Sequence, residues 1–165
     1  MVVVKVNKIL IFVNYMNKSS LLSIEELIFN LDSLNKNSIP KWGKMNSSQM
    51  MKHCSRFIDL YKGETKLPFW YKIFGVTVGK LFLFYFSKMS PLKTPRNLKT
   101  LNSIKIREEN LDFEYEKRIL TEKLQNLSNI KQDVIHPIYG KMDSEKTKFL
   151  IIHHTIHHYN QFGLI

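Results

Sequence analysis

The histidine-rich stretch that decides the fold reads Ile151-Ile152-His153-His154-Thr155-Ile156-His157-His158-Tyr159-Asn160-Gln161-Phe162. Four of the six histidines of the chain fall within six consecutive positions of it. The pairs His153/His157 and His154/His158 are spaced i, i+4, so on an α-helix the side chains of each pair lie one above the other, about 6 Å apart. Two stacked imidazoles can share one metal ion. An open site usually has three protein ligands, so a third has to come from another part of the chain.

The sequence predicts helix N-caps just before this stretch and at two positions further upstream. Asp143-Ser144-Glu145 offers an N-cap and an acidic first turn for the histidine helix. Ser23-Ile24-Glu25-Glu26 has the pattern of a capping box and opens a first helix, which we expect to end near residues 35–38. A third start, at Asn110-Leu111-Asp112, precedes a helix whose leucines share one face.

A second helix, predicted from about Ser48 to Lys62 and ending at Gly63, supplies the candidate third ligand. Its inward stripe contains Met50 and Phe57, and His53 lies beside them. Because no period-two strand pattern follows the amino-terminal residues, the four helices predict an all-α bundle. Facing helices of such a bundle can each project ligands inward.

Composition bounds the class of protein. At 165 residues the chain suits one domain, and its single cysteine, Cys54, excludes an internal disulfide and fits a reducing compartment such as the cytoplasm. The net charge of +11 favours an anionic partner. The lysines are scattered along the chain, however, and arginine occurs only four times, so the sequence gives no strong signal for nucleic-acid binding.

Two apolar segments need an interpretation. The apolar run within residues 1–15 is too short for a signal peptide. We interpret residues 1–15 as upstream sequence or a loosely ordered extension ahead of Met16. Residues 69–86 are strongly apolar but carry Lys72, Gly75, Gly79 and Lys80. We therefore expect a buried helix or a long apolar insertion between the second and third helices, and no transmembrane span.

The chemistry follows from the histidines. His53, His154 and His158 together make a three-histidine set that leaves positions for water or substrate, although periodicity alone leaves the His153/His157 pair as an alternative. Such a site can lower the pKa of a bound water to about 7 or activate a thiol. A zincin-type protease is excluded, because Thr155 stands where its glutamate base follows the first histidine.

Four sequence blocks, in this order, together resemble the DinB/YfiT-like metal-binding four-helix proteins, and more narrowly an uncharacterised branch of that superfamily. The blocks are Trp42-Gly43-Lys44-Met45, Gln49-Met50-x-x-His53-Cys54, His136-Pro137-x-x-Gly140 and His157-His158-x-x-Gln161. The likeness spans roughly residues 20–165. It implies one DinB-like domain over residues 16–165, an up-down-down-up four-helix bundle and, frequently, a homodimer.

The resemblance also selects the ligands. It implies a divalent transition metal, zinc or nickel first and iron or manganese next, held by His53, His154 and His158, and it favours this register through Gln161. Four further residues are expected to support the ligands or to line the mouth of the site: Gln161, His157, His136 and Trp42. The alternative interpretation is that His136 only makes a hydrogen bond within its loop and that Trp42 is a packing residue.

The function expected from these observations is that of a DinB-like metalloprotein. By analogy with better-studied relatives, it would be a transferase or hydrolase that activates a thiol or water toward a small electrophile, with a low-molecular-weight thiol as cosubstrate and an activity resembling a thiol S-transferase. The alternative is a non-catalytic, stress-associated or interaction module with the same bundle. A third hypothesis is a basic protein that binds nucleic acid or a membrane surface, which a contiguous Lys/Arg face would favour.

Overall fold

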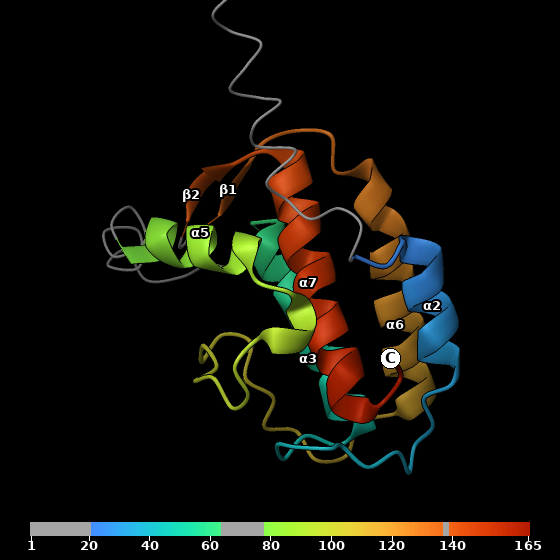
Figure 1. Ribbon diagram of the computed structural model, residues 1–165. Helices are drawn as coiled ribbons and strands as arrows, with labels where there is room; N and C mark the ends of the chain where they lie inside the picture. The colour runs from blue at the N-terminus through green and yellow to red at the C-terminus, as the bar shows by residue number, and fades with distance from the viewer. Residues whose placement is uncertain (1–20, 64–77, 137–138) are drawn as a thin grey trace, which may run out of the picture.

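The computed structural model describes residues 21–63, 78–136 and 139–165, so the interpretation of residues 1–15 lies outside the described residues. Within them the fold is mostly helical, with five α-helices, two short 3-10 helices and a two-stranded sheet (Figure 1). The prediction of a mainly helical domain is confirmed to this extent.

The first helix starts at its predicted cap, and the second starts close to its predicted position. In α2 (Ile24–Asp32) the Ser23 hydroxyl accepts from the Glu26 backbone N–H, and the Glu26 carboxylate accepts from that of Ser23. The helix α3 (Ser47–Tyr61) begins one residue before the predicted start, because Asn46 forms a second capping box with Gln49. It ends as predicted ahead of Gly63, whose φ is +78°.

The last two helices have aspartate N-caps. Asp112 caps α6 (Phe113–Gln125), which continues into the 3-10 helix η4 (Asn126–Asn129), and Asp143 caps α7 (Ser144–Phe162). At its carboxyl end α7 stops at Gly163, which takes the left-handed conformation with φ +72°.

Four of the helices pack side by side (Figure 1). The helix α3 contacts both α6 and α7, and α2 contacts the same two helices. The core between them consists of aliphatic and aromatic side chains from all four helices: Leu27, Leu31, Met50, Ile58, Leu120, Leu124, Ile151, Ile156 and Tyr159. The helix α7 is buried on several faces, since the 3-10 helix η3 (Pro91–Lys93) covers it from another side.

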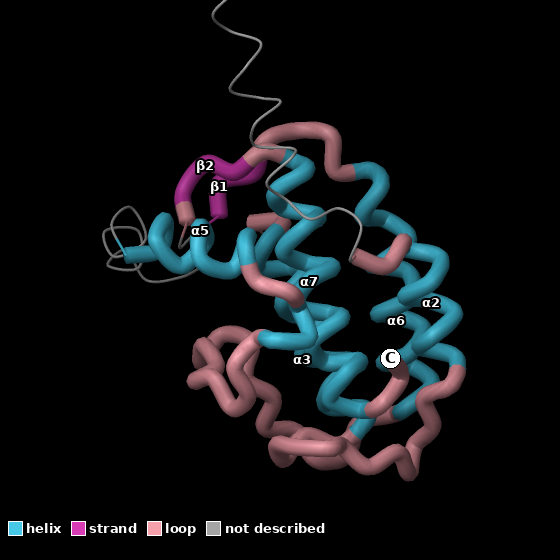
Figure 2. Tube along the Cα trace, viewed as in Figure 1, coloured by secondary structure: helices cyan, strands magenta, loops and turns pink. Residues whose placement is uncertain are grey.

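The expectation of a purely helical chain is wrong between α6 and α7. There β1 (Val134–His136) and β2 (Gly140–Met142) form an antiparallel pair that aligns Val134 with Met142 and His136 with Gly140 (Figure 2). Strands of three residues are too short to show an alternating pattern in the sequence. Gly140, whose φ is +70°, is the first residue of β2.

The predicted apolar insertion is described only from residue 78 onward, where it forms α5 (Lys80–Lys88). Leu83 and Phe86 of α5 pack against the core, whereas Leu81, Phe84 and Tyr85 are each more than half exposed. The expectation of a buried helix is therefore wrong for this part. No helix in the described ranges combines the length and apolar character that a membrane crossing needs.

Candidate metal centre

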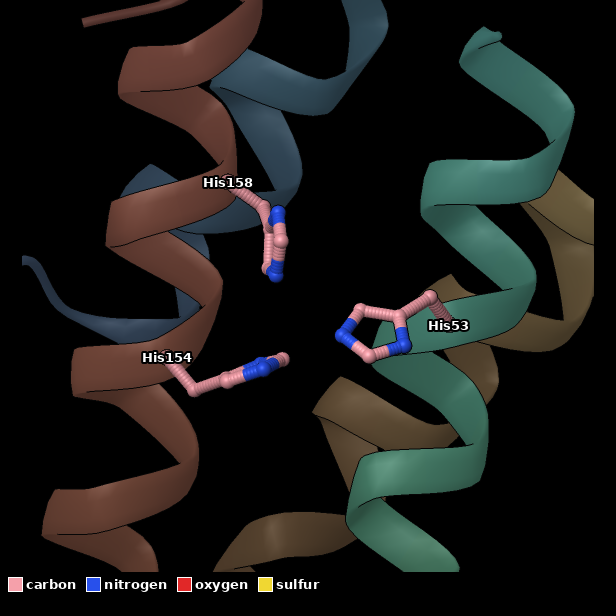
Figure 3. Close-up of side chains that lie close together, drawn as sticks. All are labelled: His53, His154 and His158. Carbon is pink, nitrogen blue, oxygen red and sulfur yellow. The ribbon is translucent and has the colours of Figure 1, made fainter. Parts of the chain in front are cut away.

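Three histidines from two helices face one another across the interface between α3 and α7. His53 comes from α3, and His154 and His158 come from successive turns of α7 (Figure 3). One ring nitrogen of each lies within 4.8 Å of one ring nitrogen of both others. His53 and His158 are buried and His154 is half-buried, so the cluster is close enough, and shielded enough, to hold one metal ion.

His53 is oriented by the chain that follows α5. Its Nδ1 lies 3.0 Å from the backbone carbonyl oxygen of Ile104, which is buried. Because a carbonyl oxygen can only accept, Nδ1 carries the hydrogen and Nε2 keeps a free lone pair. In Figure 3 this second nitrogen points toward the other two rings. A hydrogen bond of this kind on the far nitrogen is the usual way that proteins orient a ligating histidine.

The loop that carries Ile104 is itself tied to α3. Arg56, one turn after His53, donates to the carbonyl oxygen of Lys105 at 3.0 Å and to the Glu108 carboxylate at 2.6 Å. Gln49 of the same helix donates to the backbone carbonyl of Glu108 at 2.9 Å. Hydrogen bonds from backbone N–H groups, with the nearby Arg56 and Lys52, lower the pKa of Glu108 to about 2, so it stays ionised. The support of His53 is thus held by charged as well as neutral hydrogen bonds.

His158 is oriented from the other side by Gln161. The Nε2 amide of Gln161 donates to the Trp42 carbonyl oxygen at 2.6 Å, which turns the amide oxygen toward His158 Nδ1, 2.8 Å away. His158 therefore donates through Nδ1, and its Nε2 faces the cluster. Gly43 is necessary here, since a Cβ on it would lie 2.5 Å from Gln161 Nε2 and its φ is +84°.

His154 is held by stacking. Its ring lies nearly parallel to that of Phe57, with centroids 3.5 Å apart and planes 7° apart. Among the described residues its buried Nδ1 has no hydrogen-bond partner. A buried polar atom without a partner is costly, and binding to an ion is one way of satisfying it. Three imidazoles, each with one ring nitrogen close to the other two, make a donor set that fits a divalent transition metal.

The electrostatics of the cluster keep its histidines neutral. Burial is the main cause that lowers the pKa of His53, His154 and His158, and the neighbouring histidines lower it further. The hydrogen bonds to Ile104 and Gln161 act in the opposite direction and are weaker. Neutral imidazole is the form that binds metals, so the site has its ligands in the right protonation state at pH 7.

The alternative pair, His153 and His157, is not part of this cluster. His153 Nε2 lies 2.9 Å from the Thr94 hydroxyl, next to η3, and its pKa is lowered to about 4 by burial and by His157. His157 is half-buried beside Trp42, with ring centroids 5.8 Å apart, and its centroid lies 5.2 Å from that of His158. His157 and Trp42 therefore lie next to the cluster.

His136 lies on the hairpin, apart from the three rings. It is buried between Tyr61 and Tyr139, at centroid distances of 4.2 Å and 4.6 Å, and its Nδ1 accepts from the Tyr139 backbone N–H at 3.1 Å. A row of rings connects it to the cluster, because Tyr61 stacks on Phe57 and Phe57 stacks on His154. Burial raises the pKa of the Cys54 thiol, whose Sγ contacts Met50, so it is a core thiol.

Sequence reasoning missed two parts of the site. It assigned Phe57 to the inward stripe without foreseeing its stack on His154, and it gave no role to Ile104. The spacing of Phe57 from His53 could have suggested the first, since residues four apart share a helix face. The second acts through a backbone carbonyl, which every residue carries, so no side-chain pattern could have indicated it.

The fold and the cluster define a class: a mostly helical protein with three histidines, from two packed helices, placed to hold one ion. The chain belongs to the family described as "Protein of unknown function (DUF1569)", whose model matches residues 16–163. The expectation of an uncharacterised family is thereby confirmed. The chain matches no curated protein and no solved structure.

Proposed function

We propose that this chain is a DinB-like metalloprotein in which His53, His154 and His158 bind a divalent transition metal, zinc or nickel first and iron or manganese next. The observation that carries the proposal is the pair of hydrogen bonds behind the cluster, from His53 to Ile104 and from His158 to Gln161. Both fix the hydrogen on Nδ1 and leave Nε2 lone pairs directed at a common centre. The proposal includes the up-down-down-up bundle, a single domain over residues 16–165, a homodimer and a cytoplasmic location.

The reaction we propose is transfer of a thiol, or addition of water, to a small electrophile. The ion would supply Lewis acidity, which lowers the pKa of a thiol or water bound to it. The chain's own residues would orient the ligands through Ile104 and Gln161, and Phe57 would exclude water from one side of His154. Trp42 and His157, at the margin of the cluster, would line the approach of the substrate.

Metal content tests the first half of the proposal. Protein purified without a histidine tag is expected to contain close to one equivalent of a transition metal, and His53→Ala and His158→Ala are expected to lose it. His153→Gln is the matched control, because His153 lies on the same helix but contacts Thr94 instead of the cluster. Less than about 0.2 equivalents in the parent protein, or loss in the control alone, contradicts the proposal.

Activity tests the second half. A panel of low-molecular-weight thiols with small electrophiles is assayed with the protein as purified, after chelation and after metal is restored. The proposal expects turnover that disappears with the chelator and returns with the ion. Turnover that survives complete removal of the metal contradicts the proposed mechanism.

One observation favours a second candidate, a non-catalytic metal-binding or stress-associated module. Within the described residues the cluster contains three histidines and no carboxylate, so no acidic general base accompanies the ligands. Such a module is expected to bind the metal with the same dependence on His53 and His158 and to gain stability from it, about 2.7 kcal/mol at a hundredfold excess over Kd. Full metal binding without turnover in the whole thiol and hydrolysis panel distinguishes it from the enzyme.

A further inference from the structure

The positive charge of the chain is concentrated in one segment. Between Glu64 and Glu108 the sequence contains nine lysines and arginines and no aspartate or glutamate. The remainder of the chain has sixteen basic and fourteen acidic residues and is therefore almost neutral. The lysines looked scattered when only their own spacing was considered. Because this segment has no acidic residues, it accounts for nearly all of the net charge of +11.

The same segment exposes apolar side chains. Ten large hydrophobic residues are exposed in the described part of the chain, and five of them lie between residues 81 and 98. Leu81 is 70% exposed, and the other four are each more than half exposed: Phe84, Tyr85, Leu92 and Leu98. Single exposed leucines are ordinary, but a run of them on one helix and the adjoining loop indicates an interaction surface.

Basic and apolar groups alternate along this surface, which we define as residues 81–107. Its exposed cations are Lys88, Lys93, Arg96, Lys99, Lys105 and Arg107. The ammonium group of Lys88 lies 4.0 Å from the centroid of the Phe84 ring, so charge and apolar area adjoin. In Figure 2, α5 and the following loop lie on one side of α7, and α2 and α6 lie on the other. The surface is therefore separate from the side where the helices form the core.

We propose that residues 81–107 bind an anionic lipid surface, with α5 and its loop lying in the interface and not crossing it. Peripheral membrane sites combine basic residues, which are attracted to anionic headgroups, with exposed aromatic and aliphatic side chains that enter the acyl boundary. Both components are present here without an intervening carboxylate. None of the three histidines of the metal cluster lies within residues 81–107.

Charge and side-chain chemistry select lipid over two other partners. A second copy of the chain in a symmetric dimer would bring the same six cations against one another, which disfavours self-association through this surface. Nucleic-acid surfaces rely on aromatic stacking and arginine. Three of the five exposed apolar residues here are leucines, and the Arg96 guanidinium lies over the Trp42 ring at 4.4 Å.

Flotation with lipid vesicles tests the proposal on the full chain. We expect binding to vesicles of phosphatidylcholine with about 30 mol% phosphatidylserine and at least about tenfold weaker binding to phosphatidylcholine alone. The binding should weaken when the salt concentration rises, because the headgroup charges are screened. Equal binding to both vesicles, or no binding to either, overturns the proposal.

Paired variants separate charge from apolar contact. Lys93→Gln with Lys99→Gln is expected to weaken binding about 25-fold, since each basic residue near an anionic surface contributes about fivefold. Leu92→Gln with Leu98→Gln should weaken it by about tenfold or more. All four side chains are exposed, two on η3 and two in the loop that follows it, so folding should be unaffected, which circular dichroism checks.

The controls have the same chemistry elsewhere on the molecule. Phe29→Gln removes an exposed aromatic residue of α2, and Lys36→Gln with Lys44→Gln removes two exposed lysines outside the segment. Both should bind vesicles like the parent protein, and equal losses in the controls contradict the proposal. Tighter binding to a single-stranded oligonucleotide than to vesicles, or a dimer that Leu92→Gln and Leu98→Gln dissociate without any vesicle binding, assigns the surface to the other partners and also overturns it.

Discussion

The side-chain amide of Gln161 donates a 2.6 Å hydrogen bond to the backbone carbonyl of Trp42, 119 residues earlier in the chain. The Gln161 backbone carbonyl also accepts from the Lys41 N–H at 2.7 Å. The last turn of α7 is thus bonded twice to the loop before α3. Since the same amide orients His158, the position of this loop is coupled to the geometry of the cluster.

Replacing Gln161 with Met tests this coupling. Gln161→Met keeps the length of the side chain but removes the acceptor for His158 and the donor to Trp42. We expect metal affinity to fall 10–100-fold, as for other residues that orient a ligating histidine. The free energy of unfolding should fall by about 1–3 kcal/mol, because the Trp42 carbonyl loses its donor. Competition with a chromophoric chelator and urea unfolding measure the two effects.

The matched control for that substitution is Gln125→Met, at the exposed end of α6. It makes the same chemical change away from the cluster and should leave metal affinity and stability nearly unchanged. Equal affinity in Gln161→Met and the parent protein would show that Gln161 does not orient His158.

A side chain at position 43 should lower both the stability of the protein and its affinity for metal. In Gly43→Ala the new Cβ would lie 2.5 Å from Gln161 Nε2, at a φ of +84°. We expect a loss of about 1–2 kcal/mol in stability from the left-handed backbone and an additional drop in metal affinity from the displaced amide. Gly140→Ala is the control, since its φ is +70° and its Cβ would meet nothing within 4 Å. It should lose stability only; loss of affinity in both variants would contradict the role given to Gly43.

The sequence could predict those features of the fold that depend on residues close to one another in the chain. Ser23, Asp112 and Asp143 cap helices within three or four residues of themselves, so their roles could be read directly. The histidine cluster was predictable because i, i+4 spacing on α7 is also local, although its partner His53 lies on another helix. Its selection over His153/His157 rested on the family resemblance.

What escaped prediction depends on contacts between distant residues or on very short elements. The Ile104 carbonyl meets His53 across 51 positions of sequence, and the bond is made by a group common to all residues. The hairpin at Val134–His136 has too few residues for a strand pattern. The exposure of Leu81 and Phe84 could not be read either, because an apolar run looks the same whether the protein covers it or a partner does.

Arg56 provides a third test, because it secures the loop that orients His53. Arg56→Lys keeps the charge but cannot reach the Lys105 carbonyl and the Glu108 carboxylate together. We expect faster amide hydrogen exchange in residues 104–108 and an affinity for metal that falls by about tenfold. Arg118→Lys, which alters an exposed pair with Glu122 on α6, is the control. Unchanged exchange in the loop would mean that Arg56 does not hold it.

His136 predicts how stability depends on pH. Burial lowers the pKa of His136 to about 3 in the folded protein, whereas its ordinary value is 6.5. Between these values the unfolded chain binds a proton that the folded protein does not, so the free energy of unfolding falls as the pH drops below about 6.5. Above that pH both states are neutral at this residue and the effect vanishes. The slope from one histidine is at most about 1.4 kcal/mol per pH unit.

The other buried histidines add to this slope, so the contribution of His136 is obtained as a difference between two proteins. His136→Gln has an amide oxygen that can accept from the Tyr139 N–H but has no titrating group. Between pH 7 and pH 5 the parent protein should lose about 2 kcal/mol more stability than this variant. Urea unfolding at both pH values measures the difference. Parallel losses in the two proteins would show that His136 is protonated in the folded state, and so that the hairpin does not exclude water from its ring.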